Sequence, residues 1–192
     1  MARDLTHGYN AIAKDFITAR SNAGIDVIRD WANDLPEGAS VIDIGAGHGL
    51  PVTQTLVQAG LCVSAIEPST NLAAVLRQNL PSVLINQATF QTSSFLNRPY
   101  DAAISIGLIS LLNETDQAAL IQRAVSALNS SGKFLFSAPL EAGEWPDLLT
   151  GQISRSLGKA RYEALLTAAR FNQIQTFTGK GGSNYYSAAL ST

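Results

Sequence analysis

Ser40-Val41-Ile42-Asp43-Ile44-Gly45-Ala46-Gly47-His48-Gly49 is the stretch of sequence that decides how this chain folds. Its first half is apolar apart from one acid, which predicts a short buried strand. Three alternate glycines follow, and residues 51–59 then have helical spacing, with proline in the first turn where a helix tolerates it. A strand, a glycine turn and a helix in this order predict a site where the backbone closely approaches a nucleotide-like ligand.

On both sides of this stretch, apolar segments alternate with amphipathic ones. Strands are expected at 39–44, 61–66, 83–86, 101–106 and 133–137, with helices after the first strand, after caps at Ser69 and Asn113, and at 157–169. Residues 9–35 predict two helices, 138–151 a loop, and 172–178 with 184–190 an antiparallel pair. In the last helix, the residues expected to face inward are Leu157, Ala160, Ala164, Leu165 and Ala168.

This alternation predicts an α/β fold, a single-domain, doubly wound, Rossmann-like and mostly parallel sheet with a C-terminal antiparallel hairpin. We expect one domain over 1–192, made of an N-terminal helical cap at 1–38 and an α/β core at 39–192. In such a sheet the ligand lies at the carboxyl ends of the strands, where the strand order reverses.

Composition narrows the class of protein. The 192 residues are 46% hydrophobic and 15% charged, with a net charge of −2, so we expect a globular cytoplasmic protein. The thirteen lysines and arginines are scattered, which argues against nucleic acid as a partner, and no apolar run approaches a membrane span. A single cysteine, Cys62, inside an apolar run, argues against a disulfide framework and a cysteine-rich metal site, and no metal is expected.

Two carboxylates indicate which ligand the turn holds. Glu67 closes the second strand 22 positions after Gly45, where a carboxylate can accept hydrogen bonds from both hydroxyls of a ribose. Asp43 lies two residues before Gly45, where it would repel a pyrophosphate and attract an ammonium group. A dinucleotide fingerprint would place its third small residue at Leu50, but the glycine comes one residue early, at Gly49. These features favour S-adenosyl-L-methionine over NAD. An NAD-dependent oxidoreductase stays as an alternative, although the chain has no Tyr-x-x-x-Lys pair.

The same residues carry a family resemblance. The segments 41–49 and 65–69 resemble the first two motifs of class I S-adenosylmethionine-dependent methyltransferases, and 98–103 and 128–134 resemble the entries to their fourth and fifth strands. More narrowly, the chain resembles the small bacterial branch related to ubiquinone- and menaquinone-biosynthesis methyltransferases.

The resemblance implies a set of cofactor-binding residues. It assigns Asp43, Gly45 and Gly47 to the methionine end and Glu67 to the ribose. Thr89 and Phe90 stand where relatives often have an aspartate and a small residue at the adenine, and Tyr9 lies in a helix expected to fold over the cofactor. The remaining members of the predicted cofactor site are Ala46, Gly49, Pro68 and Ile106.

The sequence gives fewer indications about the residues that bind the methyl acceptor. Many relatives carry a histidine pair just beyond the fourth strand, where this chain has Ser110 and Leu111, so functions that depend on that pair are not transferred. Trp145 in the predicted loop, Arg20 and Tyr185 are the candidate acceptor-binding residues. His48 is expected to contribute backbone and His7 to be a solvated surface residue.

No catalytic residue is assigned, because in-line methyl transfer from a reactive sulfonium depends mainly on proximity and orientation. The expected activity is methyl transfer to a small-molecule acceptor by a monomer or homodimer. A non-catalytic S-adenosylmethionine-binding module is the alternative from a different class.

Overall fold

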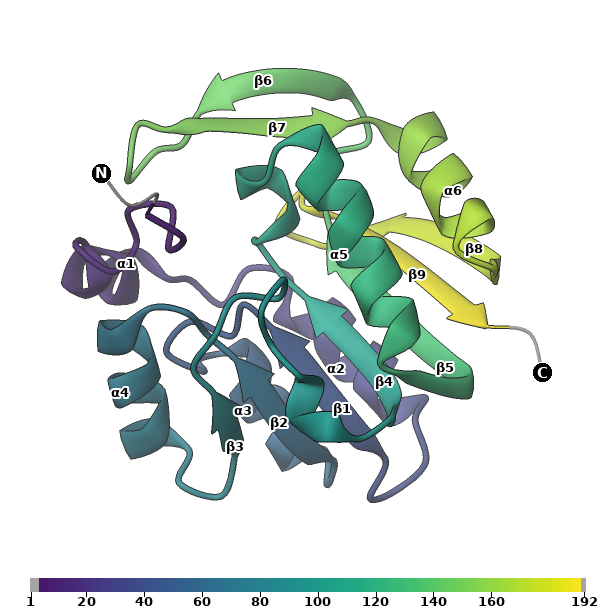
Figure 1. The fold of residues 1–192 in the computed structure, drawn as a ribbon, viewed down its shortest axis with the longest axis horizontal. Helices are drawn as coiled ribbons and strands as arrows, with labels where there is room; N and C mark the ends of the chain where they lie inside the picture. The colour runs from purple at the N-terminus through teal and green to yellow at the C-terminus, as the bar shows by residue number, and fades with distance from the viewer. Residues whose placement is uncertain (1–3, 191–192) are drawn as a thin grey trace.

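The computed structural model describes residues 4–190 (Figure 1). Its main element is a seven-stranded sheet with β1 (Ser40–Ile44) near the centre. The strand order is β3-β2-β1-β4-β5-β9-β8, and β9 runs antiparallel to both of its neighbours. The other strands are β2 (Cys62–Ile66), β3 (Leu84–Asn86), β4 (Tyr100–Ser105), β5 (Leu128–Ser137), β8 (Phe171–Thr178) and β9 (Asn184–Leu190). The order reverses between β1 and β4, so the predicted ligand position lies beside the glycine turn.

Helices cover both faces of the sheet, which confirms the doubly wound prediction. One core cluster joins the sheet to α2 (Ile25–Asn33), α3 (Val52–Gln58) and α4 (Thr70–Asn79), and a second joins it to α5 (Glu114–Ser126) and α6 (Lys159–Ala168). β1 contributes to both clusters, because Val41 belongs to the first and Ile42 to the second, as the period of a strand requires. The short helix α1 (Ala13–Ala19) and the 3₁₀ turns at Phe95–Asn97 and Ile109–Leu111 complete the helical segments. The predicted domain ends at residues 1 and 192 lie outside the described residues.

The predicted helix caps are present. The Ser69 hydroxyl accepts a hydrogen bond from the backbone N–H of Leu72 at 3.1 Å, and the Asn113 side chain accepts one from Asp116 at 2.9 Å. These bonds satisfy N–H groups that the first turn of a helix leaves without partners. The polar residue just before each apolar periodic segment therefore located both helix starts.

Three local predictions were wrong. The loop expected at 138–151 contains a strand, β6 (Ala142–Pro146), which pairs antiparallel with β7 (Ile153–Leu157) in a separate two-stranded sheet. In α6 the buried side chains are Tyr162 and Leu166, while Ala160, Ala164 and Ala168 are exposed. β5 begins at Leu128, five residues earlier than expected, with a register shift against β4.

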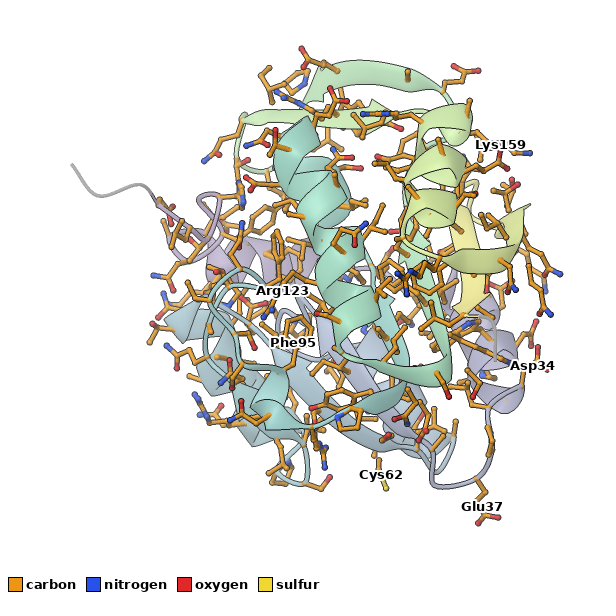
Figure 2. The ribbon with its side chains drawn as sticks, turned by 45° about the vertical axis from the view of Figure 1, so that its right-hand side comes forward. Asp34, Glu37, Cys62, Phe95, Arg123 and Lys159 are labelled. Carbon is orange, nitrogen blue, oxygen red and sulfur yellow. The ribbon has the colours of Figure 1, made fainter. Side chains whose placement is uncertain are left out.

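The end of the sheet opposite the glycine turn has solvent-exposed side chains. Cys62, at the start of β2, is exposed rather than enclosed by its apolar neighbours, and it lies at the same end of the molecule as Glu37 (Figure 2). Elsewhere on the molecule the Arg123 guanidinium stacks over the Phe95 ring at 4.8 Å, which ties α5 to the segment between β3 and β4 (Figure 2). Within residues 4–190 no helix is both long and apolar enough to cross a membrane.

Candidate functional site

The glycine turn is held against the end of β2. The backbone N–H groups of Gly45 and Ala46 both donate to the carbonyl of Ile66, at 2.8 and 3.2 Å. Gly45 and Gly47 have φ values of +82° and +61°, which residues with a Cβ rarely adopt. A Cβ at Gly45 would lie 3.0 Å from the Leu108 side chain. Glycine is therefore required at Gly45 both for the backbone conformation and for space.

Gly49 has a different role from the one predicted. It does not line the cavity, and a Cβ there would lie 2.9 Å from Leu80 and 3.2 Å from Leu76 of α4. Its φ of +85° lets the turn pass closely over this helix. The third glycine thus serves packing between the turn and α4, with no place at the cavity wall.

Asp43 is completely enclosed at the end of β1. Its carboxylate accepts a hydrogen bond from the Thr53 hydroxyl at 2.7 Å. Burial raises the pKa of Asp43 to about 6, against the opposing effects of the Thr53 bond and the nearby charge of Arg20. A small void of about 20 Å³ next to the main cavity is bounded by Asp43, Ala46 and Arg20. An acid and a guanidinium therefore face the same end of the site.

Glu67 joins the two turns that follow β1 and β2. One carboxylate oxygen accepts from the N–H of Gly47 at 2.7 Å, and the other accepts from the N–H of Ser69 at 2.8 Å. Burial raises the pKa of Glu67 to about 7, although both of these bonds lower it, and the charge of Asp43 raises it further. Besides lining the cavity, Glu67 stabilises the glycine turn, a second role that the sequence did not indicate.

A cavity of about 500 Å³ opens over the carboxyl ends of β1, β2 and β4, within the size range of small-molecule and cofactor sites. It brings together ten of the predicted residues: Tyr9, Arg20, Gly45, Gly47, Glu67, Pro68, Thr89, Phe90, Ile106 and Trp145. Residues from positions 9 to 145 therefore converge on one space.

The residues placed at the predicted adenine position are partly occupied with packing. Thr89 is buried and shares a hydrogen bond with the Thr92 hydroxyl, 3.1 Å between oxygens. Phe90 is 4% exposed and belongs to the core cluster under α5, although it also reaches the cavity wall. Thr89 and Phe90 thus line the cavity while also packing against their neighbours.

Tyr185 does not line the cavity, contrary to its assignment as an acceptor-binding residue. It is 2% exposed and stacks on Phe177 at 5.9 Å, and its hydroxyl fills the space beside Gly24, where a Cβ would lie 1.7 Å from it. The neighbouring Tyr186 is fully buried on the other face. Both tyrosines are core residues, because helices cover both faces of the sheet at β9.

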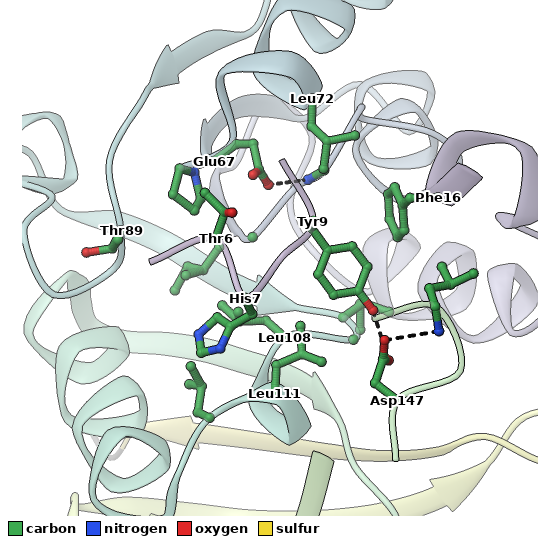
Figure 3. Close-up of a pocket in the computed structure, with 18 of the residues that line it drawn as sticks. Thr6, His7, Tyr9, Phe16, Glu67, Leu72, Thr89, Leu108, Leu111 and Asp147 are labelled. Atoms are coloured by element: carbon green, nitrogen blue, oxygen red, sulfur yellow. Dashed lines mark hydrogen bonds between the residues drawn. The ribbon is translucent and has the colours of Figure 1, made fainter. Parts of the chain in front are cut away.

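The outer wall of the cavity comes from two segments that lie far apart in the sequence. The Tyr9 hydroxyl of the N-terminal segment donates to Asp147, next to β6, at 2.9 Å, and the two side chains point toward one another in Figure 3. Gly8 also lies against this hairpin, since a Cβ there would meet Gln152 at 3.0 Å. Trp145 lines the cavity from β6 itself and not from a loop.

His7 is a cavity residue that the sequence analysis missed. It lines the space beside Leu108 and Leu111 (Figure 3), whereas a solvated surface position was expected. The only signal in the sequence was its position two residues before Tyr9. His48, in contrast, is 4% exposed, packs edge-on against Phe16 and does not line the cavity.

Comparisons with known proteins agree with this geometry. The model of the family described as "Methyltransferase domain" matches residues 16–188. A sarcosine/dimethylglycine N-methyltransferase of Aphanothece halophytica is 24% identical over 155 residues, which are 78% of this chain and 53% of that protein. A dimethylglycine N-methyltransferase of Parasynechococcus marenigrum (strain WH8102) is 28% identical over 148 residues, 72% of this chain and 51% of that protein. The chain thus spans about half the length of these curated relatives.

Solved structures share the fold. A glycopeptide N-methyltransferase complexed with S-adenosyl-L-methionine has a TM-score of 0.73 at 19% identity, covering 88% of this chain and 94% of its own. A Burkholderia thailandensis 1,6-didemethyltoxoflavin-N1-methyltransferase with bound S-adenosylhomocysteine has a TM-score of 0.67 at 19% identity, covering 100% and 93%.

The narrower resemblance to the ubiquinone- and menaquinone-biosynthesis branch stays a prediction, while the broader one is confirmed. By its match over most of its length, the chain belongs to the methyltransferase domain family, within the class I S-adenosylmethionine-dependent methyltransferases.

Proposed function

We propose that this protein transfers the methyl group of S-adenosylmethionine in line to a small-molecule acceptor. The observation that carries the proposal is the single cavity in which the glycine turn, Glu67 and an apolar outer wall meet. Bound there, S-adenosylmethionine would supply a sulfonium methyl group that a nucleophile can attack, with S-adenosylhomocysteine as the leaving group.

The residues at one end of the cavity fit the groups of this cofactor. Asp43 would pair with the methionine ammonium and Arg20 with its carboxylate, since the two side chains face the same small void. The cradle at Gly45 is space that any larger residue would fill. Glu67 would accept hydrogen bonds from the ribose hydroxyls, exchanging part of its present bonding to Gly47 and Ser69.

The remaining part of the cavity would hold the acceptor. Leu108, Leu111 and Trp145 line it, together with the N-terminal segment and the β6–β7 hairpin. Such a wall excludes water and holds an acceptor against the methyl group, which is how orientation contributes to rate. The cavity has a volume of about 500 Å³, which favours a small acceptor over a polymer.

Calorimetry tests the cofactor. We expect S-adenosylmethionine and S-adenosylhomocysteine to bind with a stoichiometry of one, and NAD to bind far more weakly. Tight NAD binding without S-adenosylmethionine binding would contradict the proposal and restore the oxidoreductase alternative.

Labelled methyl transfer tests the activity. Incubation with a metabolite extract and methyl-labelled cofactor should yield a labelled small molecule, and a chiral methyl group should be inverted if transfer is in line. Cofactor binding without any labelled product would favour the non-catalytic binding module instead.

A further inference from the structure

Asn10 binds the turn that leads from Glu67 into α4, although 59 residues separate it from Ser69 in the sequence. Its side-chain Oδ1 accepts a hydrogen bond from the Ser69 hydroxyl at 2.9 Å and another from the backbone N–H of Asn71 at 3.1 Å. The side-chain amide of Asn71 donates to the backbone carbonyl of Asn10 at 2.7 Å. Three hydrogen bonds thus attach one residue of the N-terminal segment to the start of α4.

Ser69 connects Asn10 to Glu67. It is fully buried, and its backbone N–H donates to one carboxylate oxygen of Glu67 at 2.8 Å while its hydroxyl donates to Asn10. The same hydroxyl accepts from the backbone N–H of Leu72 at 3.1 Å. Burial raises the pKa of Glu67, and of the two hydrogen bonds that oppose this rise, the one from Ser69 has the larger effect. The orientation of the Glu67 carboxylate therefore depends on the Ser69 backbone, which Asn10 helps to fix.

The N-terminal segment holds Asn10 in place by bonds of its own. The Asp4 carboxylate accepts from the backbone N–H and the hydroxyl of Thr6, at 2.8 and 2.7 Å. The Thr6 hydroxyl in turn accepts from the backbone N–H of Asn10 at 3.3 Å. The adjacent Tyr9 donates to Asp147. Two consecutive residues therefore join this segment to the β6–β7 hairpin and to the start of α4.

We propose that Asn10 is a positioning residue for cofactor recognition, which acts through Ser69 to hold the Glu67 carboxylate where the ribose hydroxyls reach it. This inference rests on the proposed function and adds a residue that does not itself line the cavity. A carboxylate held in one orientation before the ligand arrives loses less conformational freedom on binding. Without the Asn10 oxygen, the Ser69 hydroxyl loses its acceptor and the first turn of α4 loses one of its caps, so the Ser69 backbone can shift.

Two ligands that differ only in the ribose hydroxyls test the proposal. S-adenosylhomocysteine and its dideoxyribose analogue, which lacks both hydroxyls, would be titrated by calorimetry into the unmodified protein and into Asn10→Ala. We expect the unmodified protein to prefer S-adenosylhomocysteine by at least about tenfold, because hydrogen bonds to a charged acceptor are strong. Asn10→Ala should reduce this preference at least about threefold and leave the affinity for the dideoxyribose analogue nearly unchanged. An unchanged preference in Asn10→Ala would overturn the proposal.

Two further substitutions separate positioning of Glu67 from general loosening of the N-terminal segment. Asn10→Asp keeps an oxygen that accepts from Ser69 and Asn71, and a carboxylate is favourable at a helix N-terminus, so it should keep the preference. Asn71→Ala removes a bond between the same two segments, from the Asn71 amide to the Asn10 carbonyl, but keeps both bonds to Oδ1 and should also keep the preference. Loss of the preference in Asn10→Asp, or equal losses in Asn71→Ala and Asn10→Ala, would contradict a role through Ser69.

A double variant shows whether the effect passes through Glu67. In the Glu67→Ala protein, the added Asn10→Ala substitution should weaken S-adenosylhomocysteine binding no further, because no carboxylate is left to position. Additive losses of affinity would mean that Asn10 acts on the cofactor by another route, and would overturn the proposal.

Failure of the proposed function gives a different result from failure of this inference. No binding of S-adenosylhomocysteine to the unmodified protein would remove the proposed function and the role of Asn10 with it. Binding without a preference for the ribose hydroxyls, or with a preference that Asn10→Ala leaves unchanged, would remove the role of Asn10 and leave the cofactor assignment in place.

Discussion

The hydroxyl of Tyr9 donates a hydrogen bond to the carboxylate of Asp147 at 2.9 Å, across 138 residues of sequence. The bond joins the N-terminal segment to the β6–β7 hairpin, and both segments form the outer wall of the cavity. Asp147 is prepared for this contact, because its second oxygen accepts bonds from Leu149 and Thr150 that shape the hairpin end. Closure of the site therefore depends on contact between two segments that no local pattern connects.

Removing this contact should loosen the wall. Tyr9→Phe deletes the donor and Asp147→Ala deletes the acceptor, and we expect a coupling free energy of about 1 kcal/mol between them. Hydrogen exchange of the Leu149 and Thr150 amides in the two single variants and the double variant measures this coupling. Independent, additive effects would show that the bond does not hold the two segments together.

Substitutions of glycine distinguish the stability cost of backbone strain from the loss of cofactor affinity. Gly45→Val should abolish S-adenosylmethionine binding while leaving the fold largely intact, because the new side chain would collide with Leu108 in the cavity. Gly45→Ala and Gly38→Ala both place a Cβ at positive φ, at +82° and +71°, and each should cost about 1–2 kcal/mol of stability. Gly38 has no atom within 4 Å of the added Cβ, so Gly38→Ala should leave cofactor affinity unchanged. Calorimetry measures cofactor affinity and thermal denaturation measures stability for the two alanine variants. Retained affinity in Gly45→Val would show that the cofactor site lies elsewhere.

Glu67 should contribute to cofactor affinity. Glu67→Ala should weaken S-adenosylmethionine binding by about 1–3 kcal/mol, the penalty for leaving the ribose hydroxyls and the Gly47 N–H without their acceptor. Glu37→Ala, an exposed acid at the opposite end of the sheet, is the control and should have no effect. Unchanged affinity in calorimetric titrations of Glu67→Ala would exclude Glu67 from the cofactor site.

The two buried acids predict how stability and binding change with pH. A buried acid with a raised pKa holds its proton more tightly in the folded chain than in the unfolded one, so folding is favoured at low pH. This contribution is complete below the ordinary values of 3.8 for Asp43 and 4.5 for Glu67, and is lost as pH rises through about 6 and about 7. S-adenosylmethionine affinity should rise over the same window, because the ionised form of Asp43 attracts the ammonium group.

Denaturation of the free protein at a series of pH values, with calorimetry alongside, measures both trends. Glu67→Gln should reduce the loss of stability between pH 4.5 and about 7, because the titrating group is gone. A pH dependence of stability identical to that of the unmodified protein would mean that Glu67 is ionised throughout this range.

Gly49 should affect stability but not the ligand directly. Gly49→Ala places a Cβ at positive φ and against Leu76 and Leu80, so we expect a lower melting temperature. Since Gly49 does not line the cavity, S-adenosylmethionine affinity of the folded variant should stay within a few-fold of the original. A selective loss of affinity without loss of stability would return Gly49 to the cofactor site.

Local chemistry in the sequence was sufficient to predict the sheet and to assign Asp43 and Glu67 to one edge of it. Each of the signals used affects only residues close to it in the sequence. These signals are the apolar run before Gly45, the acid that follows β2, and the polar caps at Ser69 and Asn113. Parallel strands place their carboxyl ends at one edge of a sheet, so the sequence alone assigns Asp43 and Glu67 to the same site.

Only the tertiary structure decided the outer wall and the roles of single side chains. Tyr185 alternates like a half-exposed strand residue, yet helices on both faces of the sheet bury it and its neighbour. The contact between Tyr9 and Asp147, the position of His7 and the strand that carries Trp145 all depend on how distant segments pack. Local propensity records which conformation a residue favours, whereas burial and contact depend on which segments the completed fold brings opposite it.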